Sequence, residues 1–233
     1  MKDILKILAD GRRLTFDEAH RGMSIVMNGE ATEAQIGAYL MLLRQGGGPF
    51  VEEIAGSAAA MREKVVRIAT GPASQDLLID TCGTGGSGLK PFNISTATAF
   101  VLAAGGLKVA KHGNRGVSST SGSADVLMTL GVNIDVSPEV VGRCVDEIGV
   151  GYLFAPKLHP AMKYAIGPRR EIGLRTIFNV LGPLTNPAGV SRQVMGVFDE
   201  SLVELLAQVL AELGTRRAMV VHGGDGLDED AFG

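Results

Sequence analysis

The sequence predicts an α/β protein with a small all-helical N-terminal domain and a large domain whose mostly parallel sheet is covered by helices. Two observations predict this architecture. Apolar residues recur at helical spacing from the start of the chain to about Ile68. Beyond a linker at residues 70–74, short apolar runs alternate with helical stretches, which is the pattern of βα units. We therefore assign residues 1–70 to the small domain and residues 75–233 to the large domain.

Composition is that of a globular protein and excludes several other classes. Hydrophobic residues make up 45% and charged residues 20% of the chain, so a disordered or fibrous protein is not expected. A formal net charge of −3 creates no global field that attracts nucleic acid or an anionic membrane. The two cysteines, Cys82 and Cys144, are too few for a disulfide scaffold, and the N-terminus lacks the apolar core of a signal peptide. We expect a cytoplasmic protein with neither nucleic acid nor membrane as a partner.

Capping residues mark the helices of the small domain. Thr15 with Glu18 and Thr32 with Gln35 have the capping-box spacing, in which a Thr starts a helix and an acid or amide follows three residues later. Further expected boundaries are Gly29 and Gly46 as helix ends, Gly48-Pro49 as a start and about Lys64 as the last end.

The large domain is expected to alternate strands and helices. The expected strands are Leu77–Asp80, Leu107–Ala110, Gly151–Phe154, Gln193–Phe198 and Arg217–His222. The expected helices are Thr96–Ala104, Ala124–Leu130, Pro138–Ile148 and Glu200–Leu213. The segment 156–187 breaks this alternation, and we expect its helical pieces, at about residues 157–182, to pack back on the small domain.

A glycine-rich segment follows the first expected strand. It reads Asp80-Thr-Cys-Gly-Thr-Gly-Gly-Ser-Gly88, and Asn93-Ile-Ser-Thr96 then opens a helix. The glycines let the backbone approach an anion, and the hydroxyl and amide groups stand at a positively polarised helix N-terminus. The segment therefore predicts an anion cradle, although a plain glycine-rich turn followed by a helix cap fits the same residues.

A second polar segment follows the second expected strand. Lys111-His-Gly-Asn-Arg115 supplies cationic side chains, and Ser123, after a serine-rich stretch, either caps the next helix or binds phosphate. Because parallel strands end at one sheet edge, we expect both loops to line one cleft, with Gly83 beside Lys111. The alternative is a solvated, serine-rich loop. Two anion cradles together indicate a substrate with two phosphate-bearing ends.

Carboxylates follow the last expected strand, in Val221-His-Gly-Gly-Asp-Gly-Leu-Asp-Glu229. Carboxylates beside phosphate loops are typical of magnesium sites, because Mg²⁺ prefers hard oxygen ligands. A solvated acidic terminus is the alternative. The four histidines have no clustered ligand spacing, so a zinc site is not expected.

Several longer motifs resemble one enzyme family. DTCGTGGSG, FNIST, KHGNRGVSSTSGSAD, RTIFNVLGPLTNPAG and VHGGDGLDE occur in the order and spacing of the anthranilate phosphoribosyltransferase family of tryptophan biosynthesis. The resemblance implies a nucleoside phosphorylase-like phosphoribosyltransferase fold and transfer of 5-phosphoribose from phosphoribosyl pyrophosphate to the amine of anthranilate. It also implies magnesium, with two ions, and a homodimer formed through the small helical domain.

The resemblance also assigns roles by position. Residues expected at phosphoribosyl pyrophosphate are Gly83, Gly86, Ser87, Pro91, Asn93, Ser95, Thr96, Lys111, Ser119 and Ser123. Residues expected at anthranilate are Gly83, His112, Asn114, His159, Arg169, Gly182 and Pro183. Residues expected at the metal are Ser95, Asp228 and Glu229. Arg169 suits a carboxylate because its planar fork binds both oxygens, and no residue is assigned as a general base.

The sequence departs from the family pattern at three points. Ser87 stands where the family has Asp, and Pro91 stands where it has Ser or Thr. The chain stops four residues after Glu229, whereas the family's large domain continues, so we expect a domain that is incomplete at the C-terminus. Two alternative functions follow: a pyrimidine-nucleoside phosphorylase-like enzyme, and a non-catalytic binding fragment of the family.

Overall fold

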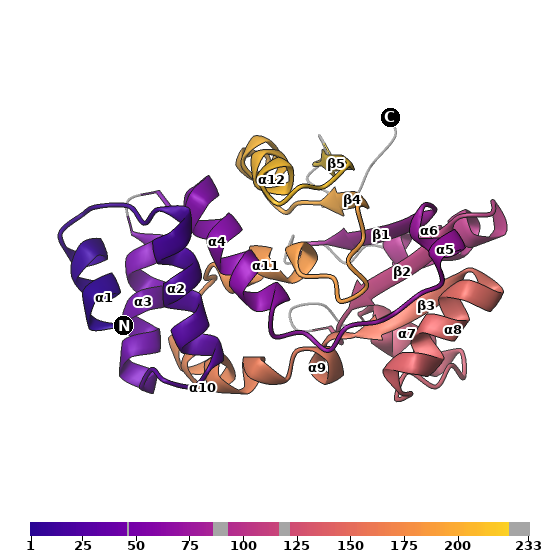
Figure 1. Cartoon of the computed structure of the whole chain (residues 1–233), viewed down its shortest axis with the longest axis horizontal. Coiled ribbons are helices and arrows are strands. Elements are labelled where there is room, and N and C mark those ends of the chain that lie inside the picture. Colours follow the sequence, from indigo (N-terminus) through magenta and orange to yellow (C-terminus); the bar gives the residue numbers. More distant parts are fainter. Residues whose placement is uncertain (46, 86–92, 117–121, 224–233) are drawn as a thin grey trace.

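The computed structural model describes residues 1–45, 47–85, 93–116 and 122–223. Figure 1 shows a bundle of helices at one end of the molecule and a sheet with its flanking helices at the other. The α/β fold class predicted from the sequence is confirmed. In the described ranges, no helix is long and apolar enough to cross a membrane.

Four helices open the chain. They are α1 (Lys2–Ala9), α2 (Phe16–Met27), α3 (Glu33–Arg44) and α4 (Val51–Arg62). Both expected capping boxes are confirmed: Thr15 and Thr32 accept hydrogen bonds from the backbone N–H groups of Glu18 and Gln35, whose side chains accept in return from the two Thr backbones. Gly46, the expected stop of α3, lies outside the described residues.

Helices α2 and α4 pack closely because one position on α4 has no side chain. A Cβ added to Gly56 would lie 2.2 Å from the backbone oxygen of Phe16. Around this contact, the fully buried Met23, Tyr39 and Ile54 fill the interior of the bundle. The bundle therefore gains its stability from an apolar interior of the kind that the helical periodicity predicts.

The sheet has five parallel strands in the order β3-β2-β1-β4-β5. They are β1 (Leu78–Gly83), β2 (Lys108–Gly113), β3 (Val150–Phe154), β4 (Arg192–Gly196) and β5 (Arg217–Val221).

The sequence prediction ends the first two strands too early, at Asp80 and Ala110, where the apolar run stops. Strand pairing instead continues to Gly83, opposite Gly196, and to Gly113, opposite Phe154. A strand can extend through polar residues such as Lys111, because the hydrogen bonds between neighbouring strands are made by backbone groups and not by side chains. Lys111 and His112 therefore lie within β2 rather than in the loop after it.

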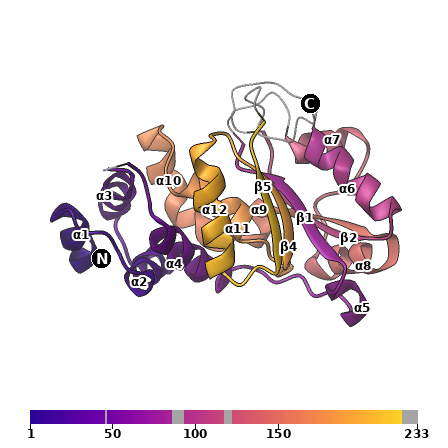
Figure 2. The ribbon, with the colours of Figure 1, turned by 90° about the horizontal axis from the view of Figure 1, so that it is seen from above.

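Helices cover both faces of the sheet, as Figure 2 shows. Helices α6 (Ile94–Ala104) and α7 (Ser123–Thr129) lie on one face, and α8 (Pro138–Ile148) and α12 (Ser201–Glu212) lie on the other. A short helix, α5 (Pro72–Gln75), precedes β1.

The segment between β3 and β4 connects the sheet with the helical bundle. It contains α9 (Ala155–Leu158), the 3-10 helix η1 (Pro160–Met162), α10 (Lys163–Ile172) and α11 (Phe178–Leu184). Helix α10 contacts α2 and α3, and α11 contacts α4. Ala165 of α10 and Leu181 of α11 belong to the same apolar cluster as Met23 of the bundle. This segment thus crosses from the sheet to the bundle and back, in addition to the crossing between α4 and β1.

Candidate functional site

The candidate site lies where the strands end at the carboxyl edge of the sheet. Because β1 and β2 are parallel neighbours, the segments that follow them emerge at the same edge. Asn93 precedes the first residue of α6, and Ser123 is the first residue of α7. Ser123 does not cap α7: the N-cap is Gly122, whose N–H donates to Asp125 Oδ2 over 2.7 Å.

Lys111 joins the two segments that the sequence singled out. Its side chain is 3% exposed, and Nζ donates to the backbone oxygen of Thr81 over 2.6 Å and to Ser95 Oγ over 3.0 Å. Thr96 Oγ1 donates to Ser123 Oγ over 2.9 Å, which ties the start of α6 to the start of α7. The structure therefore brings Lys111, Ser95, Thr96 and Ser123 together.

The electrostatics of this cluster favour an anion. Among the described residues, no side chain caps the N-terminus of α6, and a helix start carries unpaired N–H groups and a partial positive charge. The ammonium of Lys111 adds a full positive charge beside Ser95 in the first turn of that helix. A helix N-terminus next to a lysine has the chemistry of a phosphate site.

Two buried histidines face each other beside this cluster. The Nε2 atoms of His112 and His159 are 3.0 Å apart, and the exposed fractions of the two residues are 7% and 8%. The ring of His112 also makes a hydrogen bond with the backbone of Gly182.

Burial keeps both rings neutral. It lowers the pKa of His112 to about 3, with a further contribution from His159, and lowers the pKa of His159 to about 4. A neutral imidazole has one donor and one acceptor nitrogen. If His112 donates to the carbonyl of Gly182, its Nε2 accepts the N–H of His159. At neutral pH one ring of the pair therefore donates an Nε2–H to the Nε2 of the other.

The other residues expected at the aromatic substrate lie on several elements. The guanidinium of Arg169, on α10, stacks over the ring of Phe178 at 4.9 Å from its centroid, and burial lowers the pKa of Arg169. Pro183 accepts a 2.6 Å hydrogen bond from Gln193 through its backbone oxygen. Asn114 is exposed just beyond β2. Of this group, only His112, His159 and Gly182 are joined by the hydrogen bonds described above.

Known proteins match this chain along almost its whole length. A model of a glycosyl transferase family's helical bundle domain matches residues 2–65, and a model of that family's a/b domain matches residues 75–232. Anthranilate phosphoribosyltransferase from Symbiobacterium thermophilum is 55% identical over 98% of this chain and 66% of its own length. The crystal structure of anthranilate phosphoribosyltransferase from Thermus thermophilus is 44% identical, with a TM-score of 0.92 over 99% of this chain and 68% of its own. This chain belongs to the anthranilate phosphoribosyltransferase family.

More distant members of the anthranilate phosphoribosyltransferase family share the fold. The structure from Saccharomyces cerevisiae in complex with phosphoribosyl pyrophosphate and Mg is 28% identical, with a TM-score of 0.85 over 97% of this chain and 66% of its own. Another structure of the yeast protein is in complex with 4-fluoroanthranilate. The chain thus spans about two thirds of the length of the relatives that it matches. The family predicted from the sequence motifs is confirmed.

Several of the residues that the family pattern singles out lie outside the described residues. They are Gly86, Ser87, Pro91, Ser119, Asp228 and Glu229. Of the expected metal ligands, only Ser95 is described. Across the described part of the chain, no three His, Cys, Asp or Glu side chains are grouped as metal ligands.

The sequence analysis missed a buried polar network that supports the site. Asp80 is fully buried; its Oδ2 accepts from Asn186 Nδ2 over 2.8 Å, and its Oδ1 accepts from the backbone N–H of His112 over 3.2 Å. Burial raises the pKa of Asp80, and the charge of Lys111 opposes that shift. The available signal was an Asp at the end of an apolar strand, since a buried carboxylate requires partners.

Proposed function

We propose that this chain transfers the 5-phosphoribosyl group of phosphoribosyl pyrophosphate to the amine of anthranilate, giving N-(5-phosphoribosyl)anthranilate and pyrophosphate. The observation that carries the proposal is the set of hydrogen bonds from Lys111 to Ser95 and from Thr96 to Ser123, which joins β2 and the starts of α6 and α7 in one anion site. The yeast relative, which is in complex with phosphoribosyl pyrophosphate and Mg, supports the identity of the anion.

The residues divide into a donor side and an acceptor side. The donor side consists of Gly83, Gly86, Ser87, Pro91, Asn93, Ser95, Thr96, Lys111, Ser119 and Ser123. The acceptor side consists of Gly83, His112, Asn114, His159, Arg169, Gly182 and Pro183. The 4-fluoroanthranilate complex of the yeast relative supports an aromatic acid as the acceptor.

The difficult step is cleavage of the bond between C1 of ribose and the pyrophosphate oxygen. Positive charge develops on the sugar as negative charge collects on the leaving pyrophosphate. In this proposal the pyrophosphate lies against the Lys111 ammonium and the N-terminus of α6; the hydrogen bond from Lys111 to Ser95 already fixes these two groups relative to each other, which supports stabilisation of the leaving group with little reorganisation. Anthranilate attacks as a neutral amine, so its position beside C1 matters more than a strong base.

Magnesium fits the chemistry of the one described ligand. Ser95 supplies a hydroxyl oxygen in the first turn of α6, and oxygen is the donor that Mg²⁺ takes. Ser95, with Asp228 and Glu229, would hold two ions. When bound, magnesium neutralises charge on pyrophosphate as it leaves.

On the acceptor side, Arg169 binds the carboxylate of anthranilate, and the histidine pair gives the pocket a neutral polar wall. We expect Arg169→Ala to raise the KM for anthranilate roughly ten- to over a hundredfold, because one charge-assisted contact contributes about 1.5–3 kcal/mol. The KM for phosphoribosyl pyrophosphate should change little. An equal rise in both KM values would show that Arg169 acts through the fold, by its contact with Phe178.

The experiment that tests the function follows the loss of anthranilate fluorescence. Purified chain, phosphoribosyl pyrophosphate and magnesium should consume anthranilate, and Lys111→Met should abolish this consumption. A parallel reaction with phosphate and thymidine or uridine tests the phosphorylase alternative, for which free base is the product. Binding of anthranilate or phosphoribosyl pyrophosphate without turnover selects the binding-fragment alternative.

We also propose a homodimer formed through the helical bundle, a cytoplasmic location, and a division into domains at residues 1–70 and 75–233. The family models end and begin near the linker between α4 and β1, which supports the division. Light scattering of the purified chain measures the mass in solution. A monomer at high concentration would contradict the dimer.

A further inference from the structure

A second cleft lies near the amino-terminal ends of the strands; of its described lining residues, Pro183 is also expected at the candidate site. It measures about 270 Å³ and opens between the end of α4, the linker after it, the end of α11, and the segments that lead into β4 and β5. Figures 1 and 2 show these elements at the junction between the helical bundle and the sheet. The lining residues are Arg62, Val65, Arg67, Pro183, Leu184, Asn186, Pro187, Gly189, Val190, Ser191, Gln193, Leu213, Gly214 and Thr215.

The charges that line this cleft are positive. Arg62 and Arg67 line it, and its lining, as far as the described residues form it, includes no Asp or Glu. The backbone oxygens of Leu184 and Leu213, at the ends of α11 and α12, accept from Arg62 over 2.7 and 3.5 Å. Two helix C-termini together offset at most about one elementary charge, so a net positive charge remains.

The guanidinium of Arg62 has no carboxylate partner within the described part of the chain. Burial lowers its pKa, and no acidic group opposes that shift. A partly buried charge that is not neutralised is costly, and an anion in the cleft would remove that cost. The carbonyl contacts hold the guanidinium in place, so the charge is positioned before any ligand arrives.

The hydrogen-bond donors of the cleft exceed what the protein itself satisfies. Among the described residues, Arg67 and the hydroxyls of Ser191 and Thr215 make no side-chain hydrogen bond. A guanidinium and two hydroxyls match the several oxygens of a phosphate group better than the two oxygens of a carboxylate. The apolar surfaces of Val190 and Leu213 leave room for a small organic part.

We propose that this cleft is a binding site for a small phosphate-bearing molecule, distinct from the candidate site at the carboxyl edge of the sheet. Arg62 and Arg67 bind the phosphate group, and Ser191 and Thr215 donate hydrogen bonds to its oxygens. The proposal does not depend on the reaction proposed above, because no residue of the cleft other than Pro183 is assigned to that reaction.

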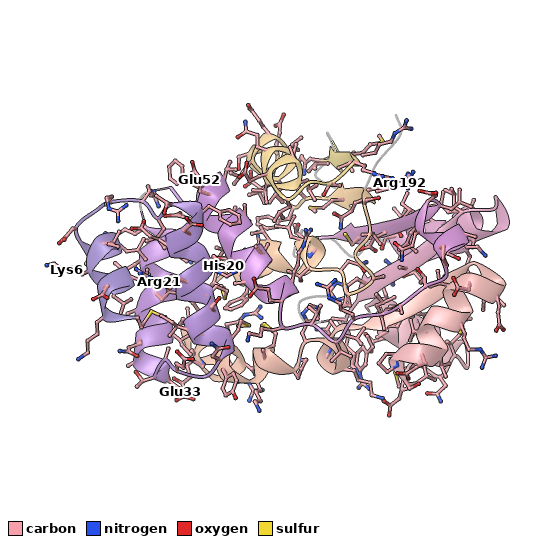
Figure 3. All side chains as sticks on the ribbon, in the orientation of Figure 1. Lys6, His20, Arg21, Glu33, Glu52 and Arg192 are labelled. Atoms are coloured by element: carbon pink, nitrogen blue, oxygen red, sulfur yellow. The ribbon has the colours of Figure 1, made fainter. Side chains whose placement is uncertain are left out.

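The test is a titration of the ¹⁵N-labelled chain with inorganic phosphate at constant ionic strength and without magnesium. The amide signals of Gly189, Gly214 and Thr215 report on the cleft, and the signal of Gly83 reports on the candidate site. We expect saturable shifts of the cleft amides, with a midpoint at least about tenfold higher in Arg67→Glu. The matched control is Arg21→Glu, the same charge change on an exposed arginine of the helical bundle (Figure 3), which should leave the midpoint unchanged.

A second variant guards against an indirect effect of charge reversal. Thr215→Val removes the hydroxyl while conserving the volume, and it should raise the midpoint severalfold. A second titration, with acetate in place of phosphate, tests whether the cleft prefers phosphate. The proposal would be overturned if phosphate shifted the Gly83 signal but not the cleft amides, or if Arg67→Glu and Arg21→Glu had equal phosphate midpoints. It would also be overturned if acetate bound with a midpoint as low as that of phosphate. The last result would make the cleft a general anion site rather than a phosphate site.

Discussion

Replacing Asn186 by Ala should destabilise the protein strongly, although the side chain removed is small. Asn186 Nδ2 donates to Asp80 Oδ2 and to the backbone oxygen of Ala110, each over 2.8 Å. Its Oδ1 accepts from the backbone N–H of Ala188 over 2.9 Å. The three partners are fully buried or nearly so, which means that water cannot replace the lost amide.

The magnitude follows from these three bonds. A neutral buried hydrogen bond contributes about 1 kcal/mol, and a bond to a charged group contributes about 1.5–3 kcal/mol. Two neutral bonds and one bond to the Asp80 carboxylate therefore give a loss of about 3.5–5 kcal/mol in the free energy of unfolding. That loss is a large fraction of the stability of an ordinary domain, which is about 5–15 kcal/mol.

Urea unfolding at pH 7, followed by circular dichroism, measures this loss. The matched control is Asn28→Ala, which removes an exposed amide bonded to Glu30 and should cost less than about 0.5 kcal/mol. Asn186→Asp adds a second test, because a carboxylate beside Asp80 is repelled by it. Repulsion raises the pKa of the carboxyl groups in the folded state, so this variant should regain stability relative to wild type as the pH falls. A difference below about 1 kcal/mol between Asn186→Ala and Asn28→Ala would refute the reasoning.

Three further predictions concern other parts of the molecule. The folded-state pKa values of His112 and His159, about 3 and about 4, lie below the unfolded value near 6.5, so the unfolded chain binds protons first as the pH falls. The free energy of unfolding should therefore fall by about 2 kcal/mol per ring between pH 7 and pH 5. In His159→Gln the urea midpoint should fall clearly less over the same pH range than in wild type. An equal fall in both proteins would contradict the lowered pKa of His159. Gly56→Ala should lower the free energy of unfolding by at least about 3 kcal/mol or prevent folding, because the added Cβ would overlap the Phe16 backbone. A variant whose thermal unfolding midpoint is close to that of wild type would disprove this. Lys111→Met should weaken pyrophosphate binding at least about tenfold in calorimetry, while an unchanged affinity would remove Lys111 from the anion site.

Local patterns in the sequence predicted most of the secondary structure. The two capping boxes were recognisable because both partners lie within three residues of each other. The helix Pro138–Ile148 was predicted with the bounds that it has, since a Ser-Pro start and a Gly stop enclose an apolar stripe. Strand ends were less predictable, because backbone pairing carries β1 and β2 past their apolar residues.

Contacts between distant residues were beyond the sequence. His112 and His159 are 47 residues apart in the chain, and Asp80 and Asn186 are 106 residues apart. Nothing in composition or periodicity predicts which buried polar groups will meet, because that depends on how the segment between β3 and β4 folds back. The sequence analysis assigned the two histidines to the site only through the family resemblance.

That returning segment also affects the order in which the protein can fold during synthesis. The ribosome releases α1 to α4 first, but Ala165 and Leu181, which fill the same apolar interior, are made roughly a hundred residues after α4. At about 5–20 residues per second, the four helices wait on the order of 5–20 s for the residues that complete them. During that interval part of their apolar surface stays open, and final closure requires contacts of long sequence separation, which form slowly. A nascent chain paused within this interval should therefore be more prone to aggregate than one released after Leu184.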